Sequence, residues 1–218
     1  MPYRRTDNVV RRMAARHAAI LKAAREAAVD GGMDAVQIVP VAERAGIATG
    51  TMYRYFPSKT DLVGALLQSM RDQELTAMRR AAMTAPGPLS ALAAAIVTFA
   101  LRSFRNRKLV WALLADPVEP EIAAIRFEFR KALAVEFRVR IAAAMAHGHF
   151  PEQDAARAAA ALVGALLEGL IGPLAAEGDN ERDAVQTVAL LALRALGVND
   201  PRARGLVVQQ AMPARDQA

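Results

Sequence analysis

Apolar residues recur at intervals of three and four along most of this chain, and this spacing predicts α-helices. The first apolar stripe is formed by Val9, Met13, Ile20, Ala24 and Ala27. It predicts a helix over about residues 7–30, which Gly31 and Gly32 would end. No segment alternates Val, Ile or Thr with polar residues between turn residues, as strands do. We therefore expect an all-α fold.

Residues 38–59, IVPVAERAGIATGTMYRYFPSK, predict two short helices with a sharp turn at Gly46, where a residue free to adopt positive φ is needed. The first helix has one apolar face, formed by Ile38, Val41, Ala42 and Ala45. The second directs three large side chains inward: Met52, Tyr55 and Phe56. It leaves five residues on its outer face: Thr49, Gly50, Thr51, Tyr53 and Arg54. The pattern predicts a helix-turn-helix.

An outer face of this composition suits the DNA major groove, because hydroxyl and guanidinium groups bond to base edges and phosphates. Pro57 ends the helix, and Ser58 is placed to cap the next one, with Asp61 three residues later. The alternative is an ordinary helical hairpin with a polar face. An Ala-x-x-x-Gly skeleton alone fits both structures equally, whereas the whole string favours DNA binding.

A long helix is predicted from Ser58 to about Ala82, and Thr84–Pro88 is the clearest linker in the chain. Further helices are expected over Leu89–Asn106, Lys108–Ala115, Glu119–Ala146, Pro151–Ala176 and Glu181–Leu196. The tail after Gly197 is expected to be loosely ordered. We assign residues 1–66 to a three-helix DNA-binding domain and residues 67–218 to a C-terminal bundle of about five helices, with the long helix joining the two.

The net charge of +6 is concentrated in the segment that holds the motif. Residues 1–60 contain ten Lys and Arg against five Asp and Glu, a net of +5, whereas the remaining residues have a net of +1. This coincidence favours DNA as the partner. Several arginines lie at the start of the chain: Arg4, Arg5, Arg11, Arg12 and Arg16. They form either an arm on the phosphate backbone or minor groove, or a basic tail that adds only nonspecific affinity.

Composition argues against other classes of protein. The longest apolar region, residues 155–176, contains Arg157, Glu168 and Pro173, so it is a poor membrane span, and the Arg-rich N-terminus lacks the apolar core of a signal peptide. We expect a cytoplasmic protein. The chain has no cysteine, three scattered histidines, no Gly-rich phosphate loop and no paired carboxylates on one face, so an enzyme is disfavoured. We expect no cofactor and no metal site.

The stretch from Val41 to Lys59, with Gly31-Gly32-Met33 before it, resembles the DNA-binding domain of the TetR (tetracycline-repressor-like) family. The resemblance covers about residues 10–66. It implies a ligand-responsive dimeric transcription regulator, usually a repressor, that binds a palindromic operator; activation stays open. Two positions depart from the family pattern. Gln37 stands where Ser or Thr usually caps the first helix of the motif, and Ala48 stands where Ser is common.

The resemblance implies that nine residues contact DNA: Gln37, Arg44, Thr49, Gly50, Thr51, Tyr53, Arg54, Tyr55 and Lys59. Arg54 is the candidate for base readout, because a guanidinium forms paired bonds to guanine O6 and N7. Lys59 is the candidate to clamp a phosphate at the start of the long helix. Two alternatives stay open: Arg44 as a solvated helix charge, and Tyr55 as a mainly structural residue.

The resemblance also implies that the last two long helices of each subunit pair in a four-helix bundle. The interface residues we predict there are Ala160, Gly164, Leu167, Gly169 and Leu190. Larger side chains, together with one acid, predict an effector pocket: Phe99, Phe104, Trp111, Leu114, Phe127, Met145 and Glu168. Internal packing is the alternative for both sets. Glu168 can anchor a cationic ligand, pair across the dimer or face water.

We therefore expect a sequence-specific homodimeric regulator whose partners are double-stranded operator DNA and a small-molecule effector. The resemblance implies that effector binding favours a dimer whose DNA-binding domains are wrongly spaced for successive major grooves, which lie about 34 Å apart. A nonspecific architectural DNA-binding protein is the alternative from another class. It would account for the basic N-terminus, but it needs neither the polar outer helix face nor a large, nearly neutral bundle.

Overall fold

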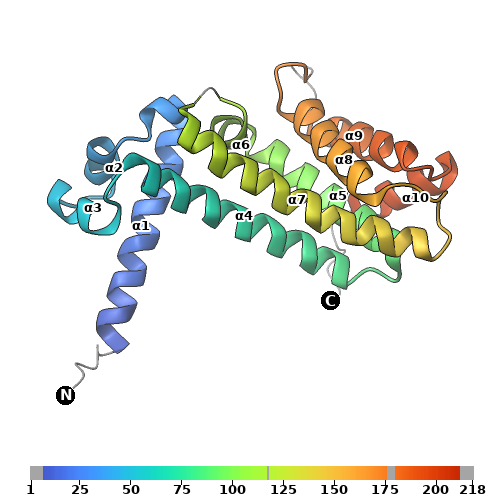
Figure 1. Cartoon of the computed structure of the whole chain (residues 1–218), viewed down its shortest axis with the longest axis horizontal. Coiled ribbons are helices and arrows are strands. Elements are labelled where there is room, and N and C mark those ends of the chain that lie inside the picture. Colours follow the sequence, from blue (N-terminus) through green and yellow to red (C-terminus); the bar gives the residue numbers. More distant parts are fainter. Residues whose placement is uncertain (1–6, 117, 176–179, 212–218) are drawn as a thin grey trace. The chain divides into compact units, whose positions relative to one another are not determined.

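The structure is a computed structural model that describes residues 7–116, 118–175 and 180–211. Every regular element in these residues is a helix (Figure 1), which confirms the all-α prediction. The chain divides into two compact units, Met1–Ser69 with Trp111–Arg126 and Met70–Val110 with Phe127–Ala218. The first unit thus includes a segment from the middle of the chain. The predicted boundary between residues 66 and 67 stays a prediction.

The first unit begins with α1 (Asp7–Gly31), a short 3-10 helix η1 (Met33–Ala35), α2 (Ile38–Arg44) and α3 (Thr49–Tyr55). Three further helices contribute residues to both units: α4 (Lys59–Met83), α6 (Arg107–Leu114) and α7 (Pro120–Ala146). The apolar spacing predicted the core of the helix-turn-helix correctly: Ile20 on α1, Val41 on α2 and Met52 on α3 are fully buried.

The turn between α2 and α3 has the predicted geometry. Gly46 has a φ of 66°, and the Ile47 backbone N–H donates to the Ala42 carbonyl at 3.0 Å, which closes the end of α2. Ser58 caps α4 as expected, because its hydroxyl oxygen accepts a hydrogen bond from the Asp61 backbone N–H at 3.1 Å. The Ser58 hydroxyl also donates to the Asp61 carboxylate at 2.7 Å.

The predicted inner stripe of α1 is wrong at its N-terminal end. Ile20, Ala24 and Ala27 are buried, but Val9 and Met13 are 42% and 39% exposed. A 25-residue helix is about 37 Å long, and the other helices of the unit cover only its C-terminal part. All of residues 9–19 are exposed, so the apolar pattern continues beyond the packed region.

The second unit packs four complete helices: α5 (Pro88–Arg105), α8 (Ala155–Leu170), α9 (Glu181–Ala195) and α10 (Asp200–Ala211). α9 lies against α5, α8 and α10 (Figure 1). Phe99 on α5 and Phe137 on α7 are both buried and meet edge to face, with ring centroids 6.3 Å apart. Within the described residues six helices, α5 to α10, follow the linker, rather than the five expected.

The sixth helix is α10, so the prediction of a loosely ordered tail is wrong. The Asn199 side chain caps it by accepting from the Arg202 backbone N–H at 3.1 Å, and Pro201 is tolerated in the first turn. α10 buries Ala203, Leu206 and Val207. The helix predicted over Pro151–Ala176 is also shorter than expected, because Asp154 caps it at residue 155 and it ends at Leu170.

One helix in the described part of the chain, α5, is long and apolar enough to cross a membrane by length and composition. Of its 18-residue window, 56% is buried inside the protein, and the helix packs against α9 and α10. These features are those of a core helix.

Candidate nucleic-acid interface

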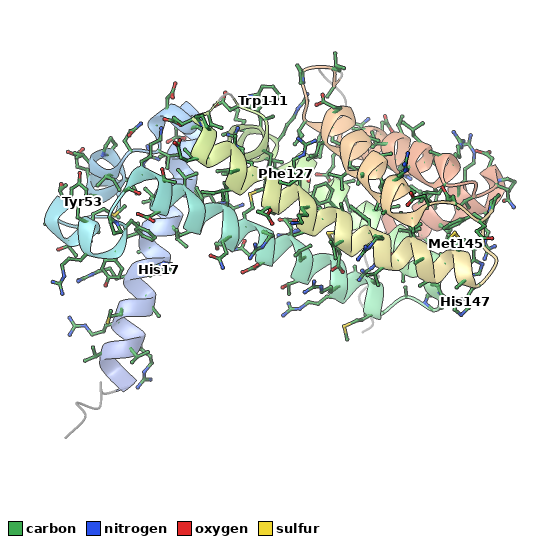
Figure 2. The ribbon with its side chains drawn as sticks, viewed as in Figure 1. His17, Tyr53, Trp111, Phe127, Met145 and His147 are labelled. Atoms are coloured by element: carbon green, nitrogen blue, oxygen red, sulfur yellow. The ribbon has the colours of Figure 1, made fainter. Side chains whose placement is uncertain are left out.

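The outer face of α3 carries the side chains that the sequence predicted for DNA. Tyr53 is 50% exposed and Arg54 is exposed, whereas Met52 is fully buried and Phe56 is 4% exposed on the inner side. Figure 2 shows the Tyr53 side chain on this helix, directed away from the core. α3 thus separates an anchoring face from a polar face that is free to enter a groove.

The remaining α3 candidates lie beside these two. Gly50 is exposed, and an added Cβ at this position would meet no atom within 4 Å, so the backbone is open on this side. Thr49, Thr51 and Tyr55 are half-buried. The half-burial of Tyr55 fits both of its predicted roles, as a packed residue and as a hydroxyl donor to a phosphate.

The two candidates from α2 have partners within the protein. The Arg44 guanidinium lies 2.6 Å from the Asp30 carboxylate at the end of α1. The Gln37 side chain donates to the Asp34 backbone carbonyl at 3.2 Å and provides no cap for α2. Both side chains are exposed, so DNA contact requires Arg44 to exchange an existing ion pair for a phosphate.

The basic N-terminus is described only in part, since Arg4 and Arg5 lie outside the described residues. Arg12 and Arg16 are exposed on the N-terminal half of α1. The ring of the next residue, His17, lies 5.2 Å from the Phe56 ring, centroid to centroid, so α1 passes next to the end of α3. The exposed arginines of α1 and the polar outer face of α3 therefore belong to adjacent elements of the first unit.

Lys59, in the first turn of α4, forms an ion pair that the sequence did not suggest. Its ammonium group lies 2.8 Å from a carboxylate oxygen of Glu119, next to the start of α7. The hydrogen bond from Lys59 lowers the pKa of the Glu119 carboxyl below its ordinary value. The predicted phosphate clamp is therefore already bound to a carboxylate.

Two further residues of this segment were missed. The Asp116 carboxylate accepts a hydrogen bond from the Met33 backbone N–H at 3.2 Å, between α1 and α2. Arg126, which is 7% exposed, donates to the Ala112 carbonyl at 2.6 Å and to the Asp116 carbonyl. In the sequence, Asp116 and Glu119 each precede a proline, so they indicate only a break between helices. Their contacts with Met33 and Lys59 span 83 and 60 residues, and no local sequence pattern shows contacts at such distances.

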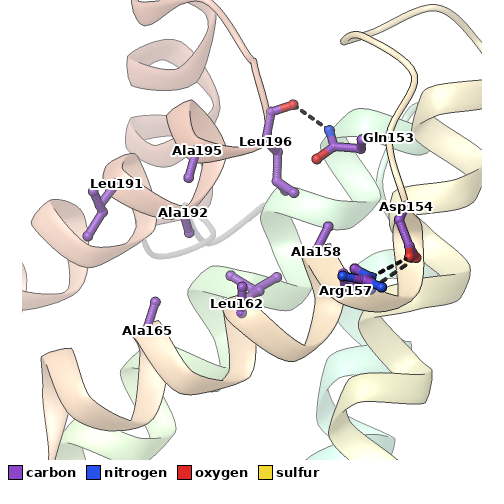
Figure 3. A pocket seen from close by; sticks show the side chains of 11 residues that line it. Gln153, Asp154, Arg157, Ala158, Leu162, Ala165, Leu191, Ala192, Ala195 and Leu196 are labelled. Carbon is purple, nitrogen blue, oxygen red and sulfur yellow. Dashed lines mark hydrogen bonds and ion pairs between the residues drawn. The ribbon is translucent and has the colours of Figure 1, made fainter.

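A second feature of the molecule is an apolar groove in the second unit, with a volume of about 570 Å³ (Figure 3). α8 contributes one wall and α9 the other; the lining includes Ala158, Ala161, Leu162, Ala165, Leu191 and Ala192. The groove has a polar end at Gln153, Asp154 and Arg157. Leu191, one of the lining residues, is 57% exposed and so adds apolar surface to the wall of the groove.

The predicted interface residues lie on these two helices. Ala160 and Gly169 are exposed, Gly164 and Leu190 are half-buried, and Leu167 is 7% exposed. None of the seven effector-pocket candidates lines the groove. Phe99 and Leu114 are buried, Phe104, Trp111 and Met145 are half-buried, and Phe127 and Glu168 are exposed. Both sets stay predictions.

Comparison with known proteins agrees with this geometry. Residues 20–66 match the family model for bacterial regulatory proteins of the tetR family. Over 115 residues the chain is 36% identical to the HTH-type transcriptional repressor KstR of Mycolicibacterium smegmatis, a match that covers 53% of this chain and 52% of that protein. Over 84 residues it is 34% identical to the HTH-type transcriptional activator FasR of the same organism, which covers 38% of each. The chain thus spans about half the length, or less, of these curated relatives.

The likeness to a solved structure extends over nearly the whole chain. RolR, solved in complex with the ligand resorcinol, superimposes with a TM-score of 0.67 over 96% of this chain and 100% of that chain. The sequence identity is 21%, so this similarity concerns the fold alone. Both halves of the chain therefore have the helical arrangement of that protein.

Proposed function

From its membership of the tetR family of bacterial regulatory proteins through residues 20–66, we propose that this chain is a sequence-specific transcriptional regulator that binds a palindromic operator as a homodimer. The proteins that it matches over part of their length are transcriptional regulators, not enzymes. The observation that carries the proposal is the outer face of α3, where Tyr53 and Arg54 are exposed while Met52 and Phe56 anchor the helix.

In the proposed complex α3 enters the major groove. Arg54 forms paired hydrogen bonds to a guanine, and Thr51 contacts a thymine methyl group or a phosphate. The open backbone at Gly50 permits close approach. Tyr53 and Lys59 bind phosphates and set the register of the helix, with Thr49, Tyr55, Gln37 and Arg44 as flanking contacts. The net charge of +5 over residues 1–60 supports this assignment.

The partner that we propose for the α8–α9 groove is a second copy of the chain. Alanines at Ala158, Ala161 and Ala165 permit close helix approach, and the exposed Leu191 offers apolar area. A two-fold interface brings the same patch of both copies together, so Ala160, Gly164, Leu167, Gly169 and Leu190 would lie in it or beside it. A two-fold dimer presents two α3 helices to two half-sites of a palindrome.

We further propose a cytoplasmic repressor that a small-molecule effector releases from DNA. Repression is chosen because the longer of the two matches described above is to a repressor, although FasR shows that activators occur among the relatives. RolR is described with resorcinol bound, so this fold accommodates a small ligand. The pocket that we propose lies within the second unit, near Phe99, Phe104 and Met145, and the chemistry of its effector stays unassigned.

Selection of binding sites from random double-stranded DNA tests the proposal. The enriched sequences should converge on a palindrome whose half-sites are about one helical turn apart, because two α3 helices must reach successive major grooves. A pool that binds but gains no common sequence would contradict sequence-specific recognition and favour the nonspecific architectural alternative.

A further inference from the structure

The Lys59–Glu119 ion pair lies where the proposed function requires a phosphate. The Lys59 ammonium and a Glu119 carboxylate oxygen are 2.8 Å apart, and the two side chains are 21% and 55% exposed. Both residues belong to the first unit, which contains the helix-turn-helix. A carboxylate and a phosphate have the same sign of charge and both accept hydrogen bonds from an ammonium group. Glu119 therefore occupies Lys59 with the same kind of bond that DNA would form.

Lys59 is held firmly at this position. It is the first residue of α4, and the bond from the Asp61 backbone N–H to the Ser58 hydroxyl fixes the start of that helix. Its side chain is the less exposed of the two, so it has limited freedom to leave the pair and bind elsewhere. A phosphate that approaches the start of α4 must displace the carboxylate.

Glu119 is held equally well from its own side. Its backbone carbonyl accepts from the Ile122 and Ala123 N–H groups at 3.0 Å, which makes it the cap residue of α7. Asp116, three residues earlier in the chain, accepts a hydrogen bond from the Met33 backbone N–H of η1 through its carboxylate. Arg126 ties α7 to the end of α6 through the Ala112 carbonyl. The start of α7, which presents the carboxylate to Lys59, is therefore held by the two backbone bonds of Glu119 and by Arg126.

We propose that Glu119 competes with the DNA backbone for Lys59 and thereby sets the sequence-independent part of the affinity for DNA. The proposal rests on the proposed function, because it requires that Lys59 binds a phosphate. It adds a residue from the α6–α7 connection to the determinants of DNA affinity. Any rearrangement of that connection that withdraws Glu119 frees Lys59 and strengthens binding.

A double-mutant cycle on the full-length protein tests this competition. The four proteins are the wild type, Glu119→Gln, Lys59→Ala and the double variant. Each is titrated by fluorescence anisotropy against a labelled duplex from the random-DNA selection and against a mixed-sequence duplex of equal length, at several salt concentrations. Circular dichroism verifies the fold, which should be retained because Glu119 is 55% exposed.

The expected result is that Glu119→Gln tightens binding to both duplexes by about two- to fivefold for each DNA-binding domain, the range that corresponds to an exposed ion pair. Lys59→Ala weakens binding and lowers the salt dependence. In the Lys59→Ala background, Glu119→Gln should have no effect, because the carboxylate then has no lysine for which to compete.

Glu121→Gln is the matched control, because Glu121 is an exposed carboxylate in the first turn of the same helix. If Glu119→Gln tightens binding equally with and without Lys59, or if Glu121→Gln does the same, the effect is general removal of negative charge and the proposal is wrong. Unchanged affinity in Glu119→Gln also overturns it.

The same titrations separate failure of this proposal from failure of the proposed function. If the wild type prefers the selected duplex and Glu119→Gln leaves the affinity unchanged, only the competition is rejected. A wild type that binds neither duplex rejects DNA binding itself, and the competition with it.

Discussion

At the scale of single residues, the basic side chains of the first unit differ in what they bind before DNA arrives. Arg44 is paired with Asp30 and Lys59 with Glu119, whereas Arg54 on α3 has no ion pair within the described part of the chain. A paired side chain must exchange one partner for another, so its net contribution to binding is small. When it binds DNA, an unpaired guanidinium gives up only its bound water. Arg54 is therefore the residue best placed to discriminate between base sequences.

Arg54→Ala and Lys59→Ala should therefore weaken DNA binding in different ways. Arg54→Ala is expected to cost about 1–3 kcal/mol on a preferred site and to relax discrimination at particular base pairs. Lys59→Ala should reduce affinity by a similar factor on every sequence and lower the slope of log K against log salt by about 1. Anisotropy titrations against a selected duplex and its single-base variants measure both effects. Equal losses on every duplex for both variants would contradict the two roles.

At the scale of elements, the caps decide where helices begin in the C-terminal bundle. The Asp154 carboxylate caps α8 by accepting from the backbone N–H groups of Ala156 and Arg157, at 2.9 and 3.1 Å. The Arg157 N–H, and to a lesser degree that of Ala156, lowers the pKa of Asp154 below its ordinary value of 3.8. Since the folded-state pKa is the lower one, the cap stabilises the protein above pH 3.8 and loses this effect as the pH falls through the folded-state value.

Asp154→Ala should therefore lower the melting temperature at pH 7, and the difference from the wild type should shrink as the pH falls below 3.8. Asp154→Asn keeps an acceptor oxygen without a charge, so its melting temperature should lie between those of the other two proteins and depend less on pH. Thermal unfolding at fixed protein concentration, at pH 7 and pH 3, measures this. A constant difference between Asp154→Ala and wild type at both pH values would contradict the assignment.

Sequence patterns predict elements well where apolar periodicity and a strong break coincide. α1, α4 and α9 begin and end within one residue of the predicted positions. α10 was missed because Asp200-Pro201 suggests a turn, although Asn199 provides a cap and a proline is compatible with a first turn. The burial of Val9 and Met13 was predicted wrongly because periodicity shows which face is apolar, but not whether another element covers it.

The residues of the candidate site likewise fall into those that local spacing predicts and those that only the fold brings together. The outer face of α3 follows from local spacing, so Tyr53 and Arg54 could be predicted from the sequence. The partner of Lys59 could not, because Glu119 lies 60 residues further along the chain and approaches it only through the fold. Long-range pairs of charged residues leave no periodic signal in a single sequence.

At the scale of the whole molecule, binding to a palindromic operator as proposed requires that two copies associate. The α8–α9 groove is apolar along most of its length, and Leu191 is 57% exposed beside it. In a two-fold dimer, the α8–α9 surface of the second chain would cover this groove and bury its apolar lining. Two DNA-binding units are also needed, because a single α3 contacts only one half-site.

Leu191→Glu should therefore yield a monomer that retains its helical content, since the side chain is exposed and its replacement leaves no cavity. DNA affinity should fall, because binding two half-sites then requires two independent monomers. Sedimentation equilibrium and anisotropy report the two effects. Leu174→Glu is the matched control, because Leu174 is 85% exposed and lies outside the groove. A Leu191→Glu protein that is still dimeric would place the interface elsewhere.

Sequence-specific binding can be measured by an anisotropy titration of the wild-type protein at physiological salt, against the intergenic DNA upstream of its own gene and against a scrambled duplex. A sequence-specific dimeric regulator should prefer the native fragment by about a thousandfold or more, with two protomers bound per site. Equal, weak and strongly salt-dependent binding to both duplexes would mean that α3 contacts only the backbone of that DNA. If binding sites selected from random DNA gave no preference either, the claim of sequence-specific regulation would be contradicted.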